Sequence, residues 1–419
     1  MAERTAADAP RRVVVIGAGM VGLSTAWYLQ ERDIEVVVVD RAGVAAGSSW
    51  GNAGWISPGL AIPLADPSVL RYGLKSLLDK HSPLYVPFAF DPALWRFLLA
   101  FARRCTMRTW RRTMADYVPV NRVATEAYDE LAAGGVTGRT IEAPIMAAFR
   151  TVALSAGLTK EIEQIHRAGL DLKTETIDGD ALRAEVPIVA RDVQTAIKIS
   201  GQRYIDPGHY VDSLADAVRD RGGQIVTGAS VRALRQGPGG FTVEMYGGDP
   251  VRGDAVVIAT GAWLPELARQ YGVKVQLRAG RGYSFSVPVS APVPCPVYFP
   301  HERVACTPLG DRLRVAGTME FRDVDAPLDL GRVDSIVRSG KPLLSGVDWN
   351  DRQDVWVGGR PVTVDGLPLV GVTRNPRVYV AGGHGMWGIT LGPITGKLLA
   401  QEISTGSVPD LLRPFDPLR

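Results

Sequence analysis

Two short apolar runs near the N-terminus, separated by a helical stretch, set the pattern of this chain. The runs Val13–Ile16 and Val36–Val39 have the length and β-branched composition of strands buried in a parallel sheet. The first run leads into the turn Gly17-Ala18-Gly19-Met20-Val21-Gly22, and the second ends at Asp40. A strand, a glycine-rich turn, a helix and a second strand ending in an acid predict the first unit of a dinucleotide-binding α/β domain.

Each residue type in this motif has a physical role. Gly17 permits a tight strand-to-helix turn, Gly19 lets the backbone approach a pyrophosphate, and Gly22 lets the helix pack closely on the strand. We expect the pyrophosphate at the helix N-terminus, where free N–H groups and the helix dipole favour an anion. Asp40 is expected to accept hydrogen bonds from ribose hydroxyls and to repel a 2′-phosphate.

Three later stretches extend the picture. Ala255–Trp263 has the pattern of a buried strand ending in small residues, which predicts its return to the nucleotide sheet. Alternating strand-like runs between residues 281 and 321 predict an antiparallel sheet that covers a pocket. Val378–Gly388 is another apolar strand that breaks into a glycine-rich turn, and a closing helix is predicted over 393–404 with Pro393 in its first turn.

The stretch from Ser68 to about Gly134 is predicted to be helical. Leu94, Phe97, Leu98 and Phe101 follow helical spacing and form one apolar face. Five basic residues crowd the end of that helix and its continuation: Arg103, Arg104, Arg108, Arg111 and Arg112. Two interpretations stay open, a solvated basic face or a face that docks on an anionic membrane surface.

Composition excludes several classes of protein. The 419 residues are 46% hydrophobic and 22% charged, with a net charge of +3, which indicates a globular protein of two domains and gives no case for nucleic acid. Cys105, Cys295 and Cys306 are widely spaced, show no metal-ligand pattern and are typical of reduced thiols in a cytoplasmic protein. No apolar run approaches the roughly 18 residues that span a bilayer.

Glycine-rich strand ends occur at both extremities of the chain, at residues 17–22 and 382–385. A nicotinamide enzyme needs one such turn, whereas a long cofactor that lies across the molecule uses both. The first helix holds its pyrophosphate and the last helix points its N-terminus at the ring, which favours non-covalent FAD. The residues expected to contact FAD are Gly17, Gly19, Met20, Val21, Gly22, Asp40, Arg41, Gly47, Ser48, Ser49, Asn52, Ala53, Gly54, Val231, Thr260, Gly261, Gly383, His384, Gly385, Met386, Trp387, Gly388, Ile389 and Thr390.

The predicted fold class is α/β: a discontinuous, Rossmann-like FAD-binding domain plus an α+β substrate domain with an antiparallel sheet and inserted helices. We expect the FAD-binding domain over 12–65, 200–280 and 355–419, and the substrate domain over 66–199 and 281–354. Residues 1–11 are expected to form a disordered leader.

The chain resembles the FAD-dependent D-amino-acid oxidase superfamily, and most of all its D-amino-acid dehydrogenase branch. The motifs that carry the resemblance run nearly from end to end. They are Asn52-Ala53-Gly54, Ser57-Pro58-Gly59, Lys80-His81-Ser82-Pro83-Leu84, Arg281-Gly282-Tyr283-Ser284, Arg314-Val315-Ala316-Gly317-Thr318, Glu320, Gly359-Arg360-Pro361-Val362-Thr363-Val364-Asp365-Gly366-Leu367-Pro368, His384-Gly385, Gly388, Thr390 and Thr395-Gly396-Lys397-Leu398-Leu399-Ala400.

This resemblance implies oxidative deamination of an amino acid, through hydride transfer from Cα to N5 of FAD, to an imino acid that hydrolyses to a 2-oxo acid. It also implies that Arg360 binds the substrate carboxylate; a structural pairing of Arg360 with Asp365 is the alternative. Three residues depart from the family pattern, Trp55, Val364 and Trp387, and they leave the substrate side chain open.

The other candidates for the site are aromatic or titratable. Tyr283 is expected to donate its phenol to the same carboxylate or, equally, to be a satisfied core residue. His384 is expected to hydrogen-bond flavin or backbone rather than transfer a proton. Trp55 and Trp387 either line the substrate pocket with Tyr283 and Arg360, or pack in the core.

Alternatives to a D-amino acid remain open at this point. The same site would serve a secondary or cyclic amino acid of the proline, hydroxyproline, sarcosine or glycine type, and a flavin-holding subunit that needs a partner is a third reading. The electron acceptor is a quinone, a dye-like acceptor or oxygen. The expected location is cytoplasmic, and peripheral contact with the inner face of the membrane is the more specific hypothesis.

Overall fold

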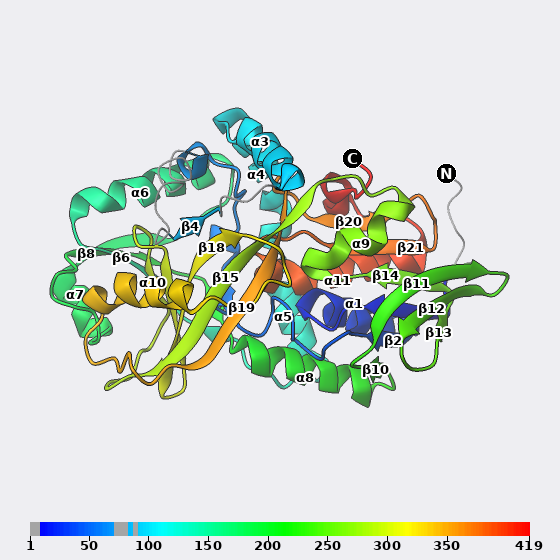
Figure 1. Ribbon diagram of the computed structural model, residues 1–419. Coiled ribbons are helices and arrows are strands. Elements are labelled where there is room, and N and C mark those ends of the chain that lie inside the picture. Colours follow the sequence, from blue (N-terminus) through cyan, green and yellow to red (C-terminus); the bar gives the residue numbers. More distant parts are fainter. Residues whose placement is uncertain (1–8, 71–82, 87–90) are drawn as a thin grey trace.

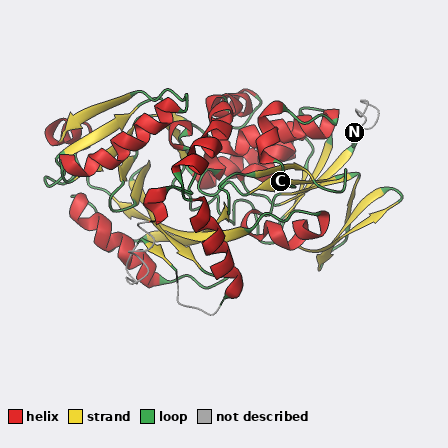
Figure 2. Ribbon diagram, turned by 90° about the horizontal axis from the view of Figure 1, so that it is seen from above, coloured by secondary structure: helices red, strands yellow, loops and turns green. Residues whose placement is uncertain are grey.

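The structure, a computed structural model, describes residues 9–70, 83–86 and 91–419. Two large sheets organise this part of the chain and lie at opposite ends of an elongated molecule (Figure 1). Figure 2 shows the same arrangement from above, with helices over the strands and a small hairpin sheet projecting at the right. The fold is therefore the predicted α/β class with two regions.

The first sheet is the predicted dinucleotide sheet. Its strand order is β10 (Gln224–Val226), β2 (Glu35–Val39), β1 (Arg12–Ile16), β14 (Ala255–Ile258), β21 (Val378–Gly382) and β20 (Leu369–Val372). The first five strands are parallel, and β20 runs antiparallel to β21. The predicted return of the strand at 255–258 to this sheet is confirmed, because β14 pairs directly with β1.

Alternation along β1 explains why this strand is apolar on both faces. Val13 and Val15 pack in the core cluster that also holds the helices α1 (Met20–Gln30) and α11 (Gly388–Thr405). Val14 and Ile16 point to the opposite face and pack with the small sheet β11 (Ser230–Gly237), β12 (Gly240–Tyr246) and β13 (Val251–Gly253) and with α9 (Leu264–Ala268). A strand covered on both faces needs side chains that are apolar at every position.

The second sheet has nine strands and is mostly antiparallel. Its order is β19 (Gln353–Thr363), β15 (Leu277–Pro288), β18 (Arg312–Phe321), β17 (Val304–Leu309), β16 (Val297–Phe299), β6 (Ile145–Phe149), β8 (Thr195–Ile199) and β7 (Thr174–Asp178), with β4 (Leu84–Tyr85) beside β18. The predicted division of the chain into domain segments stays a prediction, but one segment boundary differs from the strand pairing. The pairing of β19 with β15 joins residues 355–363 to this sheet, whereas the expected FAD segment begins at 355. Pairing between segments so far apart is not visible in the local pattern.

Helices pack around both sheets in the part of the chain that the structure describes. They are α3 (Pro92–Arg104), α4 (Met107–Arg122), α5 (Ala124–Ala133), α6 (Val152–Arg167), α7 (Gly179–Glu185), α8 (Pro207–Asp220) and α10 (Leu330–Gly340). Short 3-10 turns occupy Pro58–Leu60, Gly261–Trp263, Arg269–Tyr271, Lys341–Leu343 and Asp410–Phe415. A small three-stranded sheet has the order β3 (Trp55–Ile56), β9 (Arg203–Tyr204) and β5 (Ile141–Glu142).

The closing helix begins earlier than the sequence predicts. α11 begins at Gly388, so Pro393 lies inside the helix rather than in its first turn. Proline has no N–H, and the backbone carbonyl of Ile389, four residues earlier, therefore lacks its helical donor. The buried hydroxyl of Tyr128 on α5 donates to that carbonyl instead. The prediction missed this because the replacement donor is remote in sequence.

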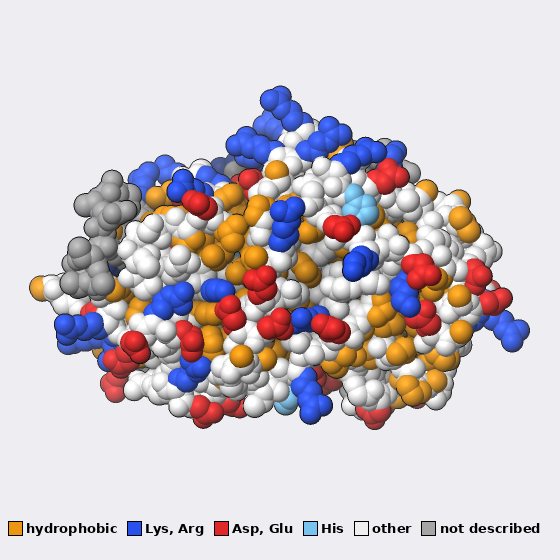
Figure 3. Space-filling model, turned by 180° about the vertical axis from the view of Figure 1, so that it is seen from behind, with side chains coloured by type: hydrophobic (Ala, Val, Ile, Leu, Met, Phe, Trp, Pro, Cys, Tyr) orange, Lys and Arg blue, Asp and Glu red, His pale blue; other side chains and the backbone are white. Residues whose placement is uncertain are grey.

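The predicted apolar face of α3 is confirmed. Leu94, Phe97 and Phe101 are buried, and Leu98 packs partly buried against the same cluster. The opposite side carries exposed Trp95 and Leu99, and the five predicted arginines of α3 and α4 are all exposed. Side chains of Lys and Arg gather over the top of the molecule, where Figure 1 places α3 (Figure 3). None of the helices in the described ranges is long and apolar enough to cross a membrane.

Candidate functional site

One cavity extends from the N-terminus of α1 to Arg360 on β19. It is lined by the ends of the parallel strands β1, β2, β14 and β21 and by the segments that follow them. The carboxyl ends of parallel strands at a change of strand order are where α/β sheets bind ligands. The cavity therefore joins the two glycine-rich turns that the sequence places at opposite ends of the chain.

The first turn leaves no room for side chains. Gly17 has a φ of +117°, and a Cβ there would lie 2.4 Å from the carbonyl oxygen of Ala259. A Cβ on Gly22 would lie 1.9 Å from the carbonyl oxygen of Gly17, so the helix approaches the turn only because this residue is glycine. α1 begins at Met20, its N-cap residue Gly19 has no side chain, and Gly19, Met20 and Val21 line the cavity.

Asp40 and Ser49 hold the loops around this turn. The two carboxylate oxygens of Asp40 accept the backbone N–H groups of Ala18, Ala42 and Gly43 at 2.8, 2.8 and 3.0 Å. The Ser49 hydroxyl accepts the N–H of Met20 at 3.1 Å. Thr260 also lines the cavity, and its buried hydroxyl has no hydrogen-bond partner among the described residues. The N-terminus of α1 at the cavity, the glycine cradle and the Thr260 hydroxyl fit the pyrophosphate half of a dinucleotide.

The second turn brings His384 to the other end of the cavity. The ring Nε2 of His384 lies 2.9 Å from the Thr395 hydroxyl on α11, and the side chain is buried. Burial lowers the pKa of His384 to about 4, so the imidazole is neutral at physiological pH. The N–H of Gly385 donates to the carbonyl of Pro361 at 3.0 Å, which ties this turn to β19.

Arg360 is a cation that lines the cavity and has no counterion among the described residues. Its Nη1 donates to the backbone carbonyl of Thr318 at 2.8 Å. Within the described residues no carboxylate lies within ion-pair range of its guanidinium, and burial lowers the pKa of Arg360 to about 10. The group remains protonated at neutral pH, so an anion that enters the cavity meets a partly desolvated positive charge.

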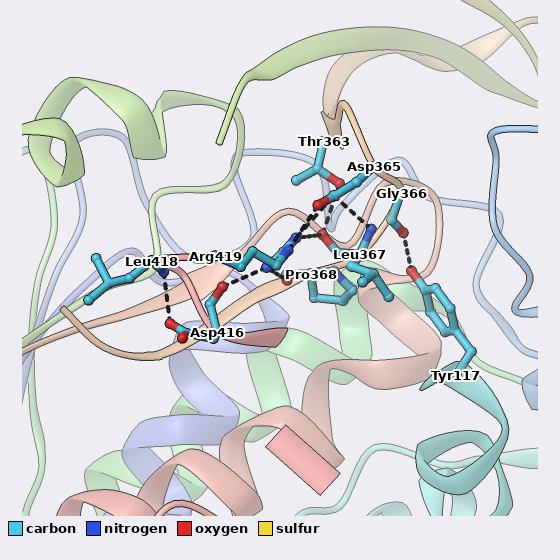
Figure 4. Close-up of polar contacts among 9 residues, drawn as sticks. All are labelled: Tyr117, Thr363, Asp365, Gly366, Leu367, Pro368, Asp416, Leu418 and Arg419. Carbon is cyan, nitrogen blue, oxygen red and sulfur yellow. Dashed lines mark hydrogen bonds and ion pairs between the residues drawn. The ribbon is translucent and has the colours of Figure 1, made fainter. Parts of the chain in front are cut away.

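The alternative pairing of Arg360 with Asp365 is wrong. The Asp365 carboxylate is held by Arg419, whose Nε and Nη2 lie 2.9 and 3.0 Å from its two oxygens (Figure 4). Burial alone would raise the pKa of Asp365, but the hydrogen bonds and charge of Arg419 outweigh it and hold the pKa below its ordinary value. Asp365 is thus fully engaged away from Arg360.

Most of the predicted site residues line this cavity. They are Gly17, Gly19, Met20, Val21, Asp40, Arg41, Gly47, Ser48, Ser49, Asn52, Val231, Thr260, Gly261, Arg360, His384, Gly385, Gly388 and Ile389. The predicted residues that do not line it are Gly22, Ala53, Gly54, Trp55, Tyr283, Gly383, Met386, Trp387 and Thr390. Thr390, for example, accepts the N–H of Ser57 at 3.1 Å and donates to the carbonyl of Trp55 at 3.1 Å. Its side chain therefore joins α11 to the segment after β3.

The three aromatic candidates point elsewhere. Tyr283 is buried on the far face of β15, and its hydroxyl donates to Glu320 at 2.7 Å, so the core reading describes it. Side chains alternate along a strand, and Gly282 rather than Tyr283 shares a face with Arg360. The indole N–H of Trp55 donates to Thr307 at 2.8 Å, and that of Trp387 donates to the Ile62 carbonyl at 2.7 Å. We leave all three out of the carboxylate site.

Sequence reasoning missed part of the cavity wall. The missed residues include Ala229, Ser230, Trp263, Glu266, Leu267 and Pro361. Trp263 lies two residues after the predicted FAD contact Gly261, and this proximity in sequence could have indicated that it lines the cavity. The guanidinium of Arg41 lies over the Trp263 ring at 3.8 Å from its centre. Residues 80–82 of the Lys80–Leu84 motif lie outside the described residues.

This fold and this cavity define a flavin-type dinucleotide-binding oxidoreductase of two regions. The chain belongs to the FAD dependent oxidoreductase family, which matches residues 12–402. It is 30% identical to a D-amino acid dehydrogenase of Xanthobacter autotrophicus (strain ATCC BAA-1158 / Py2), over 96% of both chains. It is 32% identical to a D-amino acid dehydrogenase of Methylobacterium sp. (strain 4-46), again over 96% of both.

Solved structures agree with the fold. The structure of glycine oxidase from Geobacillus kaustophilus superposes with a TM-score of 0.73 at 21% identity, covering 98% of this chain and 99% of that one. At this identity the likeness concerns the fold alone. FAD is the cofactor of the family, and the glycine cradle, the N-terminus of α1 at the cavity and the Thr260 hydroxyl, which has no partner among the described residues, fit it.

Proposed function

We propose that this protein oxidises D-amino acids to imino acids, which water hydrolyses to 2-oxo acids, with FAD as a non-covalent cofactor. One observation carries the proposal. Arg360 presents a partly desolvated cation, with no carboxylate partner among the described residues, in the same cavity as the dinucleotide cradle. The relatives named D-amino acid dehydrogenase, at about 30% identity over nearly the full length, support the choice of substrate class.

Arg360 has the main role in binding. A guanidinium holds a carboxylate through two parallel hydrogen bonds, which fixes the orientation of the adjacent Cα. When bound, FAD supplies the two-electron acceptor that takes the hydride of Cα at N5. Positioning is therefore the chief task of the protein in this reaction.

His384 assists as a neutral hydrogen-bonding group. Its low pKa excludes a resident imidazolium at neutral pH, and one ring nitrogen is already engaged with Thr395. The substrate amine loses its proton to solvent or to a carbonyl before the hydride leaves, so we assign no obligatory general base.

An anaerobic substrate panel tests the proposal. Purified protein with bound FAD is mixed without oxygen with D-, L- and N-methyl amino acids, and bleaching of the flavin absorption is recorded. We expect reduction by D-amino acids and not by their L-enantiomers. Reduction by proline, sarcosine or glycine alone would establish the alternative substrate class, and absence of reduction by every D-amino acid would overturn the proposal.

We also propose a peripheral contact of the α3–α4 surface with the inner face of an anionic membrane, from which a quinone would take the electrons. The α3–α4 surface consists of exposed Trp95 and Leu99 together with the exposed Arg103, Arg104, Arg108, Arg111 and Arg112. Apolar side chains that enter the headgroup region beside cations are the pattern of interfacial binding. All three cysteines are free and buried, which supports a location on the cytoplasmic side of that membrane.

Vesicle sedimentation tests this contact. The protein is mixed with vesicles of phosphatidylcholine alone or with one-third phosphatidylglycerol, and the bound fraction is measured. We expect binding to the anionic vesicles only, with loss in a Trp95→Glu/Leu99→Glu variant. Leu330→Glu on α10, where the side chain is equally exposed, is the control and should bind as the wild type does.

A further inference from the structure

We propose that Gly282 and Thr318 form a socket that positions Arg360, and that this socket determines how tightly the carboxylate binds. The inference rests on the proposed function, because it assigns the residues that aim its carboxylate-binding group. Gly282 lies on β15, the neighbour of β19, and Thr318 lies on β18, the next strand beyond β15, so the side chain of Arg360 reaches from β19 across β15 to β18.

Gly282 supplies the floor of the socket. An added Cβ at Gly282 would lie 2.2 Å from Nη2, 2.3 Å from Cζ and 2.6 Å from Nη1 of Arg360. The guanidinium therefore rests directly on the backbone of this glycine, which has an ordinary strand position. Glycine is needed here because any side chain would occupy the place of the guanidinium.

Thr318 supplies the acceptor that fixes the rotation of the guanidinium. Its φ is +58°, which is unusual for a β-branched residue, and the β15–β18 pairing shifts by one residue between Arg281 and Tyr283. This bulge turns the Thr318 carbonyl out of the ladder to accept Nη1 of Arg360 at 2.8 Å. The buried Thr318 hydroxyl has no partner among the described residues, so the local conformation is not maintained by that hydroxyl.

The socket leaves one edge of the guanidinium for a ligand. Nη1 is engaged with Thr318, and this is the hydrogen bond that the guanidinium makes within the described residues, so Nε and Nη2 have no acceptor there. That edge is a planar pair of donors with the geometry of a carboxylate. Because the side chain is held before a ligand arrives, its orientation does not have to be fixed during binding.

A methyl group at Gly282 tests the socket. Gly282→Ala places a Cβ against the mobile end of Arg360 rather than against backbone, so the protein should fold with full FAD content. We expect KM for the best D-amino acid of the panel to rise at least tenfold, while kcat changes less than threefold. Gly280→Ala is the matched control. Its Cβ, on the same face of the same strand, meets Val362 and Met319 instead, and KM should stay within twofold.

A double variant separates positioning through Arg360 from a general effect on the sheet. In the Arg360→Ala background the guanidinium is absent, so adding Gly282→Ala should raise KM by no more than a further twofold. The Tm of the double variant should not be lower than the Tm of Gly282→Ala alone. Unchanged KM in Gly282→Ala, or full additivity with Arg360→Ala, would overturn the inference. Unchanged KM in Arg360→Ala itself would instead overturn the proposed function.

Discussion

Arg419 holds Asp365 with two charged hydrogen bonds and also donates to three backbone carbonyls, those of Leu367, Pro368 and Asp416. Tyr117 on α4 donates to the carbonyl of Gly366 in the same turn at 2.7 Å. The turn that follows β19 is thus fixed from two sides, five residues beyond Arg360. This relationship frees Arg360 for a ligand and gives the turn its rigidity.

Loss of Arg419 should therefore destabilise the protein. Arg419→Ala removes the counterion of the partly buried Asp365 carboxylate and the donor to the Pro368 carbonyl, and we expect a loss of about 2 kcal/mol in the free energy of unfolding. Urea denaturation at pH 7 measures it. The wild-type advantage should fall as the pH drops below about 4, because the pair depresses the pKa of Asp365 and its stabilisation is lost when the carboxylate is protonated. Arg413→Ala, which removes a largely exposed ion pair with Asp410, is the control and should change stability little.

A side chain at Gly17 should abolish cofactor binding. Gly17→Ala combines a φ of +117° with a Cβ 2.4 Å from a backbone oxygen, so the turn must move, and we expect FAD affinity to fall by at least about 2 kcal/mol. The ratio of flavin absorbance to protein after gel filtration measures this. Gly43→Ala, in the loop after β2, places its Cβ in open space and should keep the wild-type ratio. Equal FAD content in both variants would show that the turn tolerates a side chain.

Lysine should not replace Arg360. Arg360→Lys keeps the charge but loses the planar pair of donors, and we expect a loss of about 2 kcal/mol in substrate binding, roughly a thirtyfold rise in KM. FAD content should be unchanged, because the flavin cradle lies in other segments. Steady-state kinetics with a D-amino acid, beside an amine that lacks a carboxylate, checks the assignment. An unchanged KM for the amino acid would remove Arg360 from the site.

Burial of neutral His384 should make stability fall in mildly acidic conditions. A histidine whose pKa drops from its ordinary value to about 4 on folding binds more protons when unfolded, so stability decreases as the pH falls from about 6.5 toward 4. The expected decrease is about 3 kcal/mol, because each unit of pKa change corresponds to about 1.4 kcal/mol. Urea unfolding of the wild type and of His384→Gln across this range measures it. The difference between the two curves isolates His384, since buried Glu402, whose pKa burial raises to about 7, is common to both.

Local motifs could be predicted from the sequence, whereas contacts between segments far apart in the chain could not. Gly17, Asp40 and Thr260 were identified because each strand, turn and acid forms a contiguous pattern that sterics explain. For Tyr283 the site and the core stayed equally expected, because choosing between the two faces of β15 needs the register with β18 and β19, which no local pattern gives. Arg419 and Thr318 were missed for the same reason, because their partners lie 54 and 42 positions away.

The early start of α11 leads to the last prediction. Pro393 removes the helical donor to the Ile389 carbonyl beside the cavity, and the Tyr128 hydroxyl replaces it from α5. Tyr128→Phe keeps the ring and its packing but leaves this buried carbonyl without a donor, so we expect a loss of about 1 to 3 kcal/mol in the free energy of unfolding. Thermal and urea unfolding of the FAD-free protein measure it, and Tyr246→Phe, at an exposed position on β12, serves as the control with no expected change. Because Ile389 lines the cavity, the same variant should also bind FAD more weakly than the control does. Stability equal to that of the control would mean that another group satisfies the Ile389 carbonyl.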